Sequence, residues 1–105
     1  MNRIVGSFIY QRRSSNSISS LFINNATRSH VINRGIATSP NAIDDFIGEY
    51  SEISFEEDRQ INYFLVIRND NLHYQLDWQN EHRVPIFTGR GFLENGRLVG
   101  YYTEI

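Results

Sequence analysis

Apolar and polar residues alternate over much of residues 46–105, with the period of two that is typical of half-buried β-strands. In LHYQLDW, residues 72–78, one face carries Tyr74, Leu76 and Trp78, whereas the other face is polar. FIGEYSEISF, residues 46–55, alternates in the same way over its later part. This pattern predicts antiparallel strands that place one face against a core.

Turn-forming residues divide this half of the chain into short segments. Asn95-Gly96 is the strongest hairpin signal, and Asn69-Asp70-Asn71 is a second turn. The polar residues 79–85, which include Pro85, predict a loop. The predicted strands of this half lie at residues 46–55, 62–68, 72–78, 86–93 and 97–105.

The first 45 residues contain further strand-like runs. Apolar and aromatic residues gather at positions 4–5, 8–10, 18–23 and 31–32, and Asn24-Asn25 predicts a turn before the last of them. We therefore expect one all-β domain over residues 1–105, with seven or eight short antiparallel strands forming an open meander or a small barrel.

Charge is distributed unevenly between the two parts of the chain. Residues 1–43 contain five arginines and no acid (+5), and residues 44–105 contain twelve acids and five arginines (−7), which gives the total of −2. A basic, serine-rich N-terminus is also typical of a cleaved mitochondrial segment, which would leave residues 37–105 as the mature protein. Gly6 and the serines form helices poorly, which favours a segment that belongs to the fold. We expect a cytoplasmic protein, with a mitochondrial one as the alternative.

One short motif, two apolar residues followed by glycine, any residue and an aromatic residue, occurs three times. It is found at residues 4–8 (IVGSF), 46–50 (FIGEY) and 98–102 (LVGYY). A glycine inside a strand leaves room on the sheet face for a large ring, so Phe8, Tyr50 and Tyr102 should fill the interior beside such gaps. The repetition predicts an imperfect internal duplication, with coincidence as the alternative.

These motifs carry a resemblance to known proteins. Tyr74-Gln75-Leu76-Asp77-Trp78, Gly89-Arg90-Gly91 and the run from Asn95 to Tyr101 resemble bacterial all-β domains of uncharacterised function, which repeat G-x-Y, Y-x-x-x-W, G-x-G and L-V-G-Y along their strands. The resemblance covers about residues 46–105. The architecture is also similar to that of lipocalin- and avidin-type meander barrels, which implies small-molecule binding at a barrel mouth. No ligand motif of those families is present, so no binding residue follows from it.

Residue types exclude several kinds of chemistry. The chain has no cysteine and no lysine, which excludes disulfides, cysteine-zinc sites and Schiff-base catalysis. His73 and Asp77 would lie about 13 Å apart along a strand, too far to share a metal. Glu81-His82 are adjacent and should point apart. We therefore expect a protein that is not an enzyme and that binds no metal or cofactor.

Two classes of partner are also disfavoured. Arginines that could contact phosphates stand at positions 3, 12, 13, 28 and 34, but the charge of −7 on the rest of the chain would repel a nucleic acid. No apolar run of about 18 residues exists, so we expect no transmembrane helix.

The function that remains is binding without catalysis. An aromatic-lined concave face would take a small apolar ligand or a protein partner, and the candidate binding residues are Tyr50, Tyr74, Trp78, Tyr101 and Tyr102. The same rings would suit a core equally well. The alternative is an interaction module, or a homodimer, that pairs through an exposed edge strand at residues 97–105.

Overall fold

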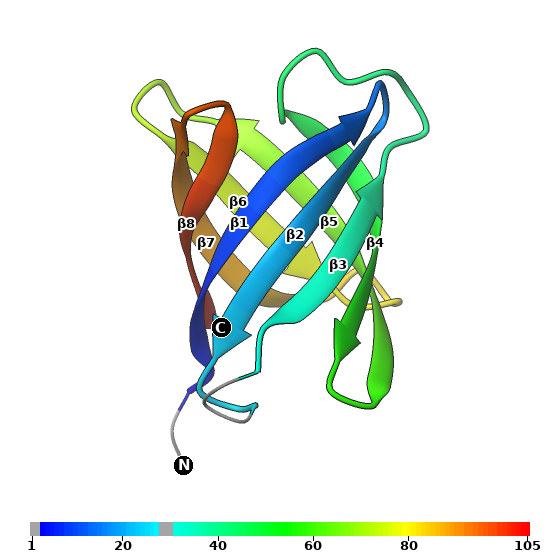
Figure 1. Ribbon diagram of the computed structural model, residues 1–105, viewed down its shortest axis with the longest axis vertical. Helices are drawn as coiled ribbons and strands as arrows, with labels where there is room; N and C mark the ends of the chain where they lie inside the picture. Colours follow the sequence, from blue (N-terminus) through cyan, green and yellow to red (C-terminus); the bar gives the residue numbers. More distant parts are fainter. Residues whose placement is uncertain (1–2, 28–30) are drawn as a thin grey trace.

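The chain forms a closed antiparallel β-barrel in the computed structural model, which describes residues 3–27 and 31–105 (Figure 1). Each strand pairs with the next in sequence, as a meander. The strands of the described residues are β1 (Val5–Ser14), β2 (Ser17–Asn24), β3 (Asn33–Thr38), β4 (Gly48–Glu56), β5 (Arg59–Asn69), β6 (Tyr74–Gln79), β7 (Pro85–Glu94) and β8 (Arg97–Glu104). None of the described residues belongs to a helix long and apolar enough to cross a membrane.

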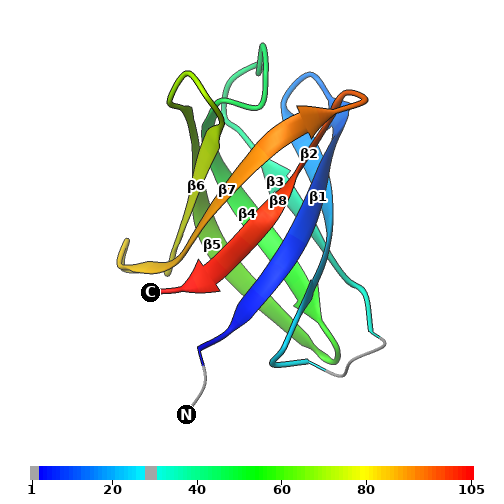
Figure 2. The ribbon, with the colours of Figure 1, turned by 90° about the vertical axis from the view of Figure 1, so that its left-hand side faces the viewer.

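The barrel closes because the last strand pairs with the first. Figure 2 shows β8 between β7 and β1, and the β1–β8 register runs from Val5 opposite Thr103 to Tyr10 opposite Leu98. The prediction of an exposed edge at residues 97–105 is therefore wrong, since both sides of β8 carry ladder hydrogen bonds. Closure leaves no unpaired strand there for a partner to extend.

The basic first part of the chain contributes β1, β2 and β3 to the barrel wall. Loss of residues 1–36 would remove β1, β2 and the first four of the six residues of β3. The strand predicted at Val31-Ile32 instead begins at Asn33. Its inward residues Asn33, Gly35 and Ala37 are polar or small, so the apolar signal of β3 is weak in the sequence.

The predicted strands of residues 46–105 are confirmed, with ends shifted by a few residues. Asn95 and Gly96 both have positive φ angles, 53° and 77°, as the predicted two-residue hairpin requires. The proposed duplication gains no support, because its alignment pairs Phe22 with Phe64. Phe22 lines the interior, whereas the Phe64 ring lies 3.7 Å from the guanidinium carbon of Arg83 on the outer face.

Glycines make room for rings inside the barrel, although the motif glycines do so unevenly. A Cβ atom at Gly6 would lie 2.6 Å from Cζ of Tyr102, whereas one at Gly100 would meet only backbone atoms of β7. A Cβ atom at Gly89 would lie 3.1 Å from the Trp78 ring, and one at Gly91 would lie 3.3 Å from Cζ of Phe8. The three motif aromatics, Phe8, Tyr50 and Tyr102, are all buried. In a barrel of this size, such side chains nearly fill the interior.

One end of the barrel is plugged by its own chain. The β3–β4 connection, residues 39–47, crosses the upper end in Figure 1 and buries Ile43 and Phe46. The Tyr50 hydroxyl donates to the carbonyl of Phe46 at 2.7 Å, and the Tyr74 hydroxyl donates to Oδ2 of Asp45 at 2.6 Å. We call this region the plugged end. Apolar residues beneath it complete the core: Ile18, Ala37, Leu65, Ile67, Leu76 and Leu98.

Candidate ligand-binding pocket

The opposite end of the barrel contains a cavity of about 40 Å³, which we call the pocket. Its rim residues belong to the strand ends farthest from the plug and are only partly buried, so the cavity reaches the barrel mouth. Seven of its residues are aromatic: Phe8, Tyr10, Phe22, Tyr63, Trp78, Phe87 and Tyr102. Five are polar: Ser20, Asn24, Glu52, Ser54 and Glu56.

The aromatic rings pack edge to face around the cavity. The centroids of Trp78 and Tyr102 lie 5.6 Å apart, as do those of Phe87 and Tyr102, and those of Tyr63 and Phe87 lie 6.1 Å apart. Such contacts hold the rings in fixed orientations. The pocket therefore has rigid apolar walls.

A chain of hydrogen bonds crosses the inner part of the pocket. Trp78 donates from Nε1 to the Tyr10 hydroxyl at 3.3 Å, and that hydroxyl donates to Oε1 of Glu52 at 2.5 Å. Strand alternation places all three inside, because Tyr10 is in phase with Phe8, and Glu52 is in phase with Tyr50. A carboxyl group thus lies in the centre of an otherwise aromatic interior.

Burial changes the acidity of this pair. Removal from water is the main reason that the pKa of Glu52 is raised to about 7; hydrogen bonds from Tyr10 and Trp78 lower it in part, and the nearby Glu56 adds to the increase. Burial, together with the neighbouring Glu52, raises the pKa of Tyr10 well above 10. Tyr10 therefore keeps its proton, and Glu52 is the group that titrates near neutral pH.

Two further oxygens lie beside Gly35 on the inner wall of the pocket, where the glycine has no side chain. A Cβ atom on Gly35 would lie 2.7 Å from Oγ of Ser20 and 3.1 Å from Oε2 of Glu52. Ser20 Oγ is buried and has no hydrogen-bond partner among the described residues. Glu52 accepts from Tyr10 through Oε1, which leaves Oε2 on the side of Ser20 and Gly35. Both oxygens can contact a bound molecule.

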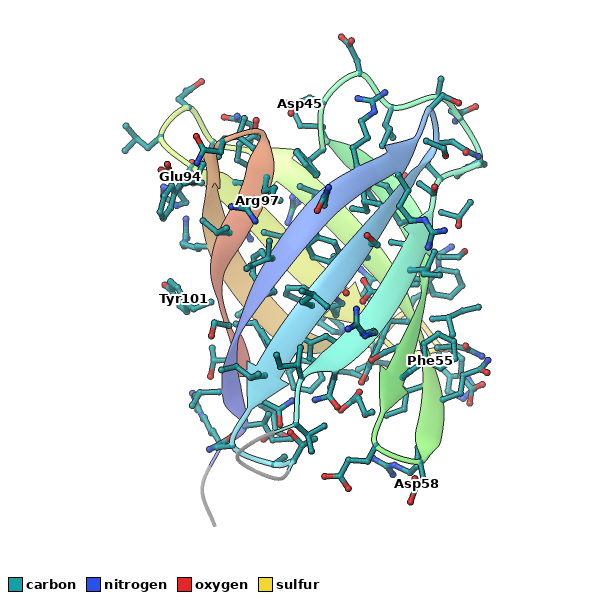
Figure 3. All side chains as sticks on the ribbon, viewed as in Figure 1. Asp45, Phe55, Asp58, Glu94, Arg97 and Tyr101 are labelled. Carbon is teal, nitrogen blue, oxygen red and sulfur yellow. The ribbon has the colours of Figure 1, made fainter. Side chains whose placement is uncertain are left out.

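The residues predicted to bind a ligand do not form one site. Trp78 and Tyr102 line the pocket, whereas Tyr50 and Tyr74 support the plugged end. Tyr101 is 57% exposed and projects away from the barrel (Figure 3). Tyr101 faces outward because neighbouring residues of a strand face opposite sides of the sheet, and Tyr102 faces inward.

The polar half of the pocket was not predicted from the sequence. Tyr50, Glu52 and Ser54 alternate with outward residues on β4, so the buried position of Tyr50 carries Glu52 and Ser54 inside with it. That signal was present, but a glutamate between serines resembles the solvent face of a strand.

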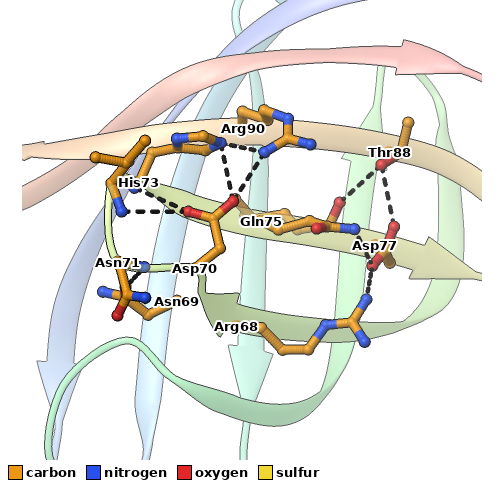
Figure 4. A network of polar contacts seen from close by, with 11 residues as sticks. Arg68, Asn69, Asp70, Asn71, His73, Gln75, Asp77, Thr88 and Arg90 are labelled. Atoms are coloured by element: carbon orange, nitrogen blue, oxygen red, sulfur yellow. Dashed lines mark hydrogen bonds and ion pairs between the residues drawn. The ribbon is translucent and has the colours of Figure 1, made fainter.

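A second polar cluster lies on the outer face of β5, β6 and β7 (Figure 4). Asp70 accepts hydrogen bonds from Arg90 at 3.0 Å and from the backbone N–H of His73 at 3.1 Å. The bond from the His73 backbone is the main reason that the pKa of Asp70 is lowered. Asp77 accepts from Arg68 at 2.6 Å. The network joins the β5–β6 turn to β7.

The expectation that Glu81 and His82 point apart is wrong, since Oε1 of Glu81 lies 3.6 Å from Nε2 of His82, although both side chains are more than three-quarters exposed. No group of acids and histidines in residues 3–27 and 31–105 could hold a metal. Arg12 donates to the carbonyl of Ile43 at 2.5 Å and so helps to hold the plug. Arg28 and His30 lie outside the described residues.

In comparisons with known proteins, no family model, curated protein or solved structure matches the chain.

Proposed function

We propose that this protein binds a small molecule in the pocket, as a lipocalin-like barrel does, without catalysing a reaction. The observation that carries the proposal is Ser20 Oγ, which is buried without a hydrogen-bond partner among the described residues and lies beside Oε2 of Glu52 at Gly35. Both residues are about 96% buried. Buried polar groups are costly unless they are hydrogen-bonded. A ligand, or water where no ligand is bound, would satisfy them.

The contrast with the plugged end supports this interpretation. At the plugged end, the buried hydroxyls of Tyr50 and Tyr74 have partners within the chain. A barrel of this size has an interior just wide enough to hold one small ligand. A volume of about 40 Å³ limits the part of the ligand that enters to a few atoms, with the remainder at the aromatic rim.

The proposal can be tested by a fragment screen with ligand-observed NMR on the full chain. Ser54→Leu should fill the pocket and abolish binding of any hit, because Ser54 is 2% exposed and lines the cavity. Ser51→Leu, on the same strand but facing outward, is the matched control and should retain binding. Circular dichroism would show that both variants fold. Equal binding by both variants, or a screen without hits, would reject the proposal.

An exposed apolar strip suggests protein interaction as a second candidate function. The outer faces of β2, β3 and β4 carry five large apolar side chains that are 37–48% exposed: Leu21, Ile23, Ile36, Ile53 and Phe55. Contiguous exposed apolar surface commonly marks a binding face. Because the strand edges are closed, a partner or a second copy would contact this strip rather than extend the sheet.

Light scattering after size-exclusion chromatography tests this candidate. Self-association that Phe55→Ser abolishes would support it. A monomer at every concentration would exclude association between copies through the strip.

A further inference from the structure

The inner wall of the pocket presents acceptors and little else for a ligand to contact. Register places Ser20 of β2 and Ser54 of β4 on either side of Gly35, with Glu52 one inward position farther along β4. Because Gly35 has no side chain, Ser20 Oγ and Glu52 Oε2 both reach the space above it. A group that bonds to both oxygens must therefore carry at least one hydrogen to donate to the carboxylate.

The negative charge of the pocket also favours a ligand that donates hydrogen bonds. Its described lining includes two carboxylates, Glu52 and Glu56, and no arginine or histidine. Glu56 is already engaged, because it accepts from Ser54 at 3.1 Å. No cation of the described lining balances Glu52, so its charged form lacks a counter-ion within the chain. A cationic ligand would supply one, and the faces of the surrounding rings also favour a cation.

The size of the cavity limits the cationic group. A water molecule occupies roughly 10–15 Å³ of such space, so 40 Å³ holds about three groups of that size. An aminoethyl group, with two carbons and one nitrogen, matches that number. A guanidinium or a trimethylammonium group has about four heavy atoms at the charged end, which exceeds that number.

We infer that the ligand is a small primary amine, bound as an ammonium ion that donates to Glu52 Oε2 and Ser20 Oγ. Its hydrocarbon part would extend along the rings of Tyr63 and Phe87 toward the mouth. This inference rests on the proposed function and adds to it the chemical class of the ligand. A neutral alcohol, which could donate to the same oxygens, is the competing class.

The test compares three probes of nearly equal size: 2-phenylethylamine, 2-phenylethanol and phenylacetate. Binding to the full chain would be measured by calorimetry at pH 8, with the emission of Trp78, the only tryptophan, as an independent report from the pocket. We expect the amine to bind at least tenfold more tightly than the alcohol, and phenylacetate not to bind.

Variants on one strand separate charge from fold. Glu52→Gln should weaken amine binding at least tenfold, whereas Glu49→Gln, which removes an outward-facing carboxylate from β4, should change it less than twofold. Ser20→Ala removes the second acceptor and should weaken it several-fold.

The pH dependence for the native chain provides a measurement that needs no variant. The titratable groups that surround Glu52 are Tyr10, Glu56, Tyr63 and Tyr102; burial raises the pKa of each of the three tyrosines above 10, so none of these hydroxyls ionises between pH 5 and 8. Amine binding should weaken as the pH falls below about 7, where Glu52 becomes protonated, by up to tenfold per pH unit.

The outcomes distinguish failure of the amine inference from failure of the proposed ligand binding. If the alcohol binds as tightly as the amine, or if neither Glu52→Gln nor low pH weakens amine binding, the amine inference is rejected while ligand binding stands. If none of the probes binds and the fragment screen also gives no hit, the proposed function itself fails.

Discussion

The two ends of the barrel differ in how their buried polar groups are hydrogen-bonded. At the plugged end, residues 39–47 fold inward, and buried polar groups such as the Tyr50 hydroxyl bond to the chain's own backbone. At the pocket end, Ser20 Oγ has no partner in the described residues and lies beside Oε2 of Glu52 at Gly35. The plugged end is organised for stability, and the pocket end retains groups whose burial lowers stability.

The largest effect should come from the plug. Phe46→Ala removes a ring that is 7% exposed and should lower the free energy of unfolding by about 4 kcal/mol, measured by urea denaturation. Phe55→Ala, on the outer face and 45% exposed, is the control and should cost about 1 kcal/mol or less. Equal losses would show that the connection does not contribute a core.

Stability should fall as the pH rises through the range in which Glu52 titrates. Its pKa in the folded chain, about 7, exceeds its ordinary value of 4.5, so the unfolded chain releases this proton first. The contribution is complete below pH 4.5 and is lost by pH 7 to 8, a difference of about 3 kcal/mol. Urea denaturation at fixed ionic strength would measure it.

Glu52→Gln provides the control for this pH dependence. The variant has no carboxyl at this position, so most of the slope between pH 4.5 and 8 should disappear. An unchanged slope would assign the effect to other groups.

Two serines of the pocket should respond in opposite directions. Ser20→Ala removes a buried hydroxyl without a partner in the described chain, and should raise the free energy of unfolding by about 1 kcal/mol if the site is dry. Ser54→Ala removes the hydrogen bond to Glu56 and should lower it by about 1 kcal/mol. A loss at Ser20 as large as that at Ser54 would indicate that bound water already satisfies Ser20.

The smallest effect should occur at Tyr101, which lies outside both regions. Because the ring is 57% exposed, Tyr101→Ser should change the free energy of unfolding by less than about 0.5 kcal/mol and leave ligand binding unaltered. A clear loss of binding, seen by NMR titration with a screening hit, would place part of the site on the outer surface.

Residues near the chain's strongest patterns were the most predictable. The alternation in residues 72–78 placed Tyr74, Leu76 and Trp78 on the buried face, and Asn95-Gly96 located a hairpin. Strand β3 was placed too early, at Val31-Ile32, because its inward residues Asn33, Gly35 and Ala37 are polar or small. What holds β3 in place is the pairing of Gly35 with Ser20 of β2 and with Ser54 of β4. That pairing depends on the neighbouring strands and cannot be read from the local sequence.

The site was less predictable than the fold for a related reason. Aromatic residues indicated the interior, but they do not indicate which end of a barrel is filled. That depends on residues 39–47 entering the barrel, and neither Ile43 nor Phe46 stands in a periodic segment. Glu52 was passed over because its burial requires partners from β1 and β6, far away in the sequence.

The pairing of β1 with β8 has a consequence for synthesis of the protein. Val5 cannot meet Thr103 until β8 has left the ribosome, so the wall of the barrel stays incomplete until then. Contacts between such distant positions form slowly, and the edges of β1 and the newest strand remain exposed meanwhile. A nascent chain that stalls before β8 would therefore be open to aggregation.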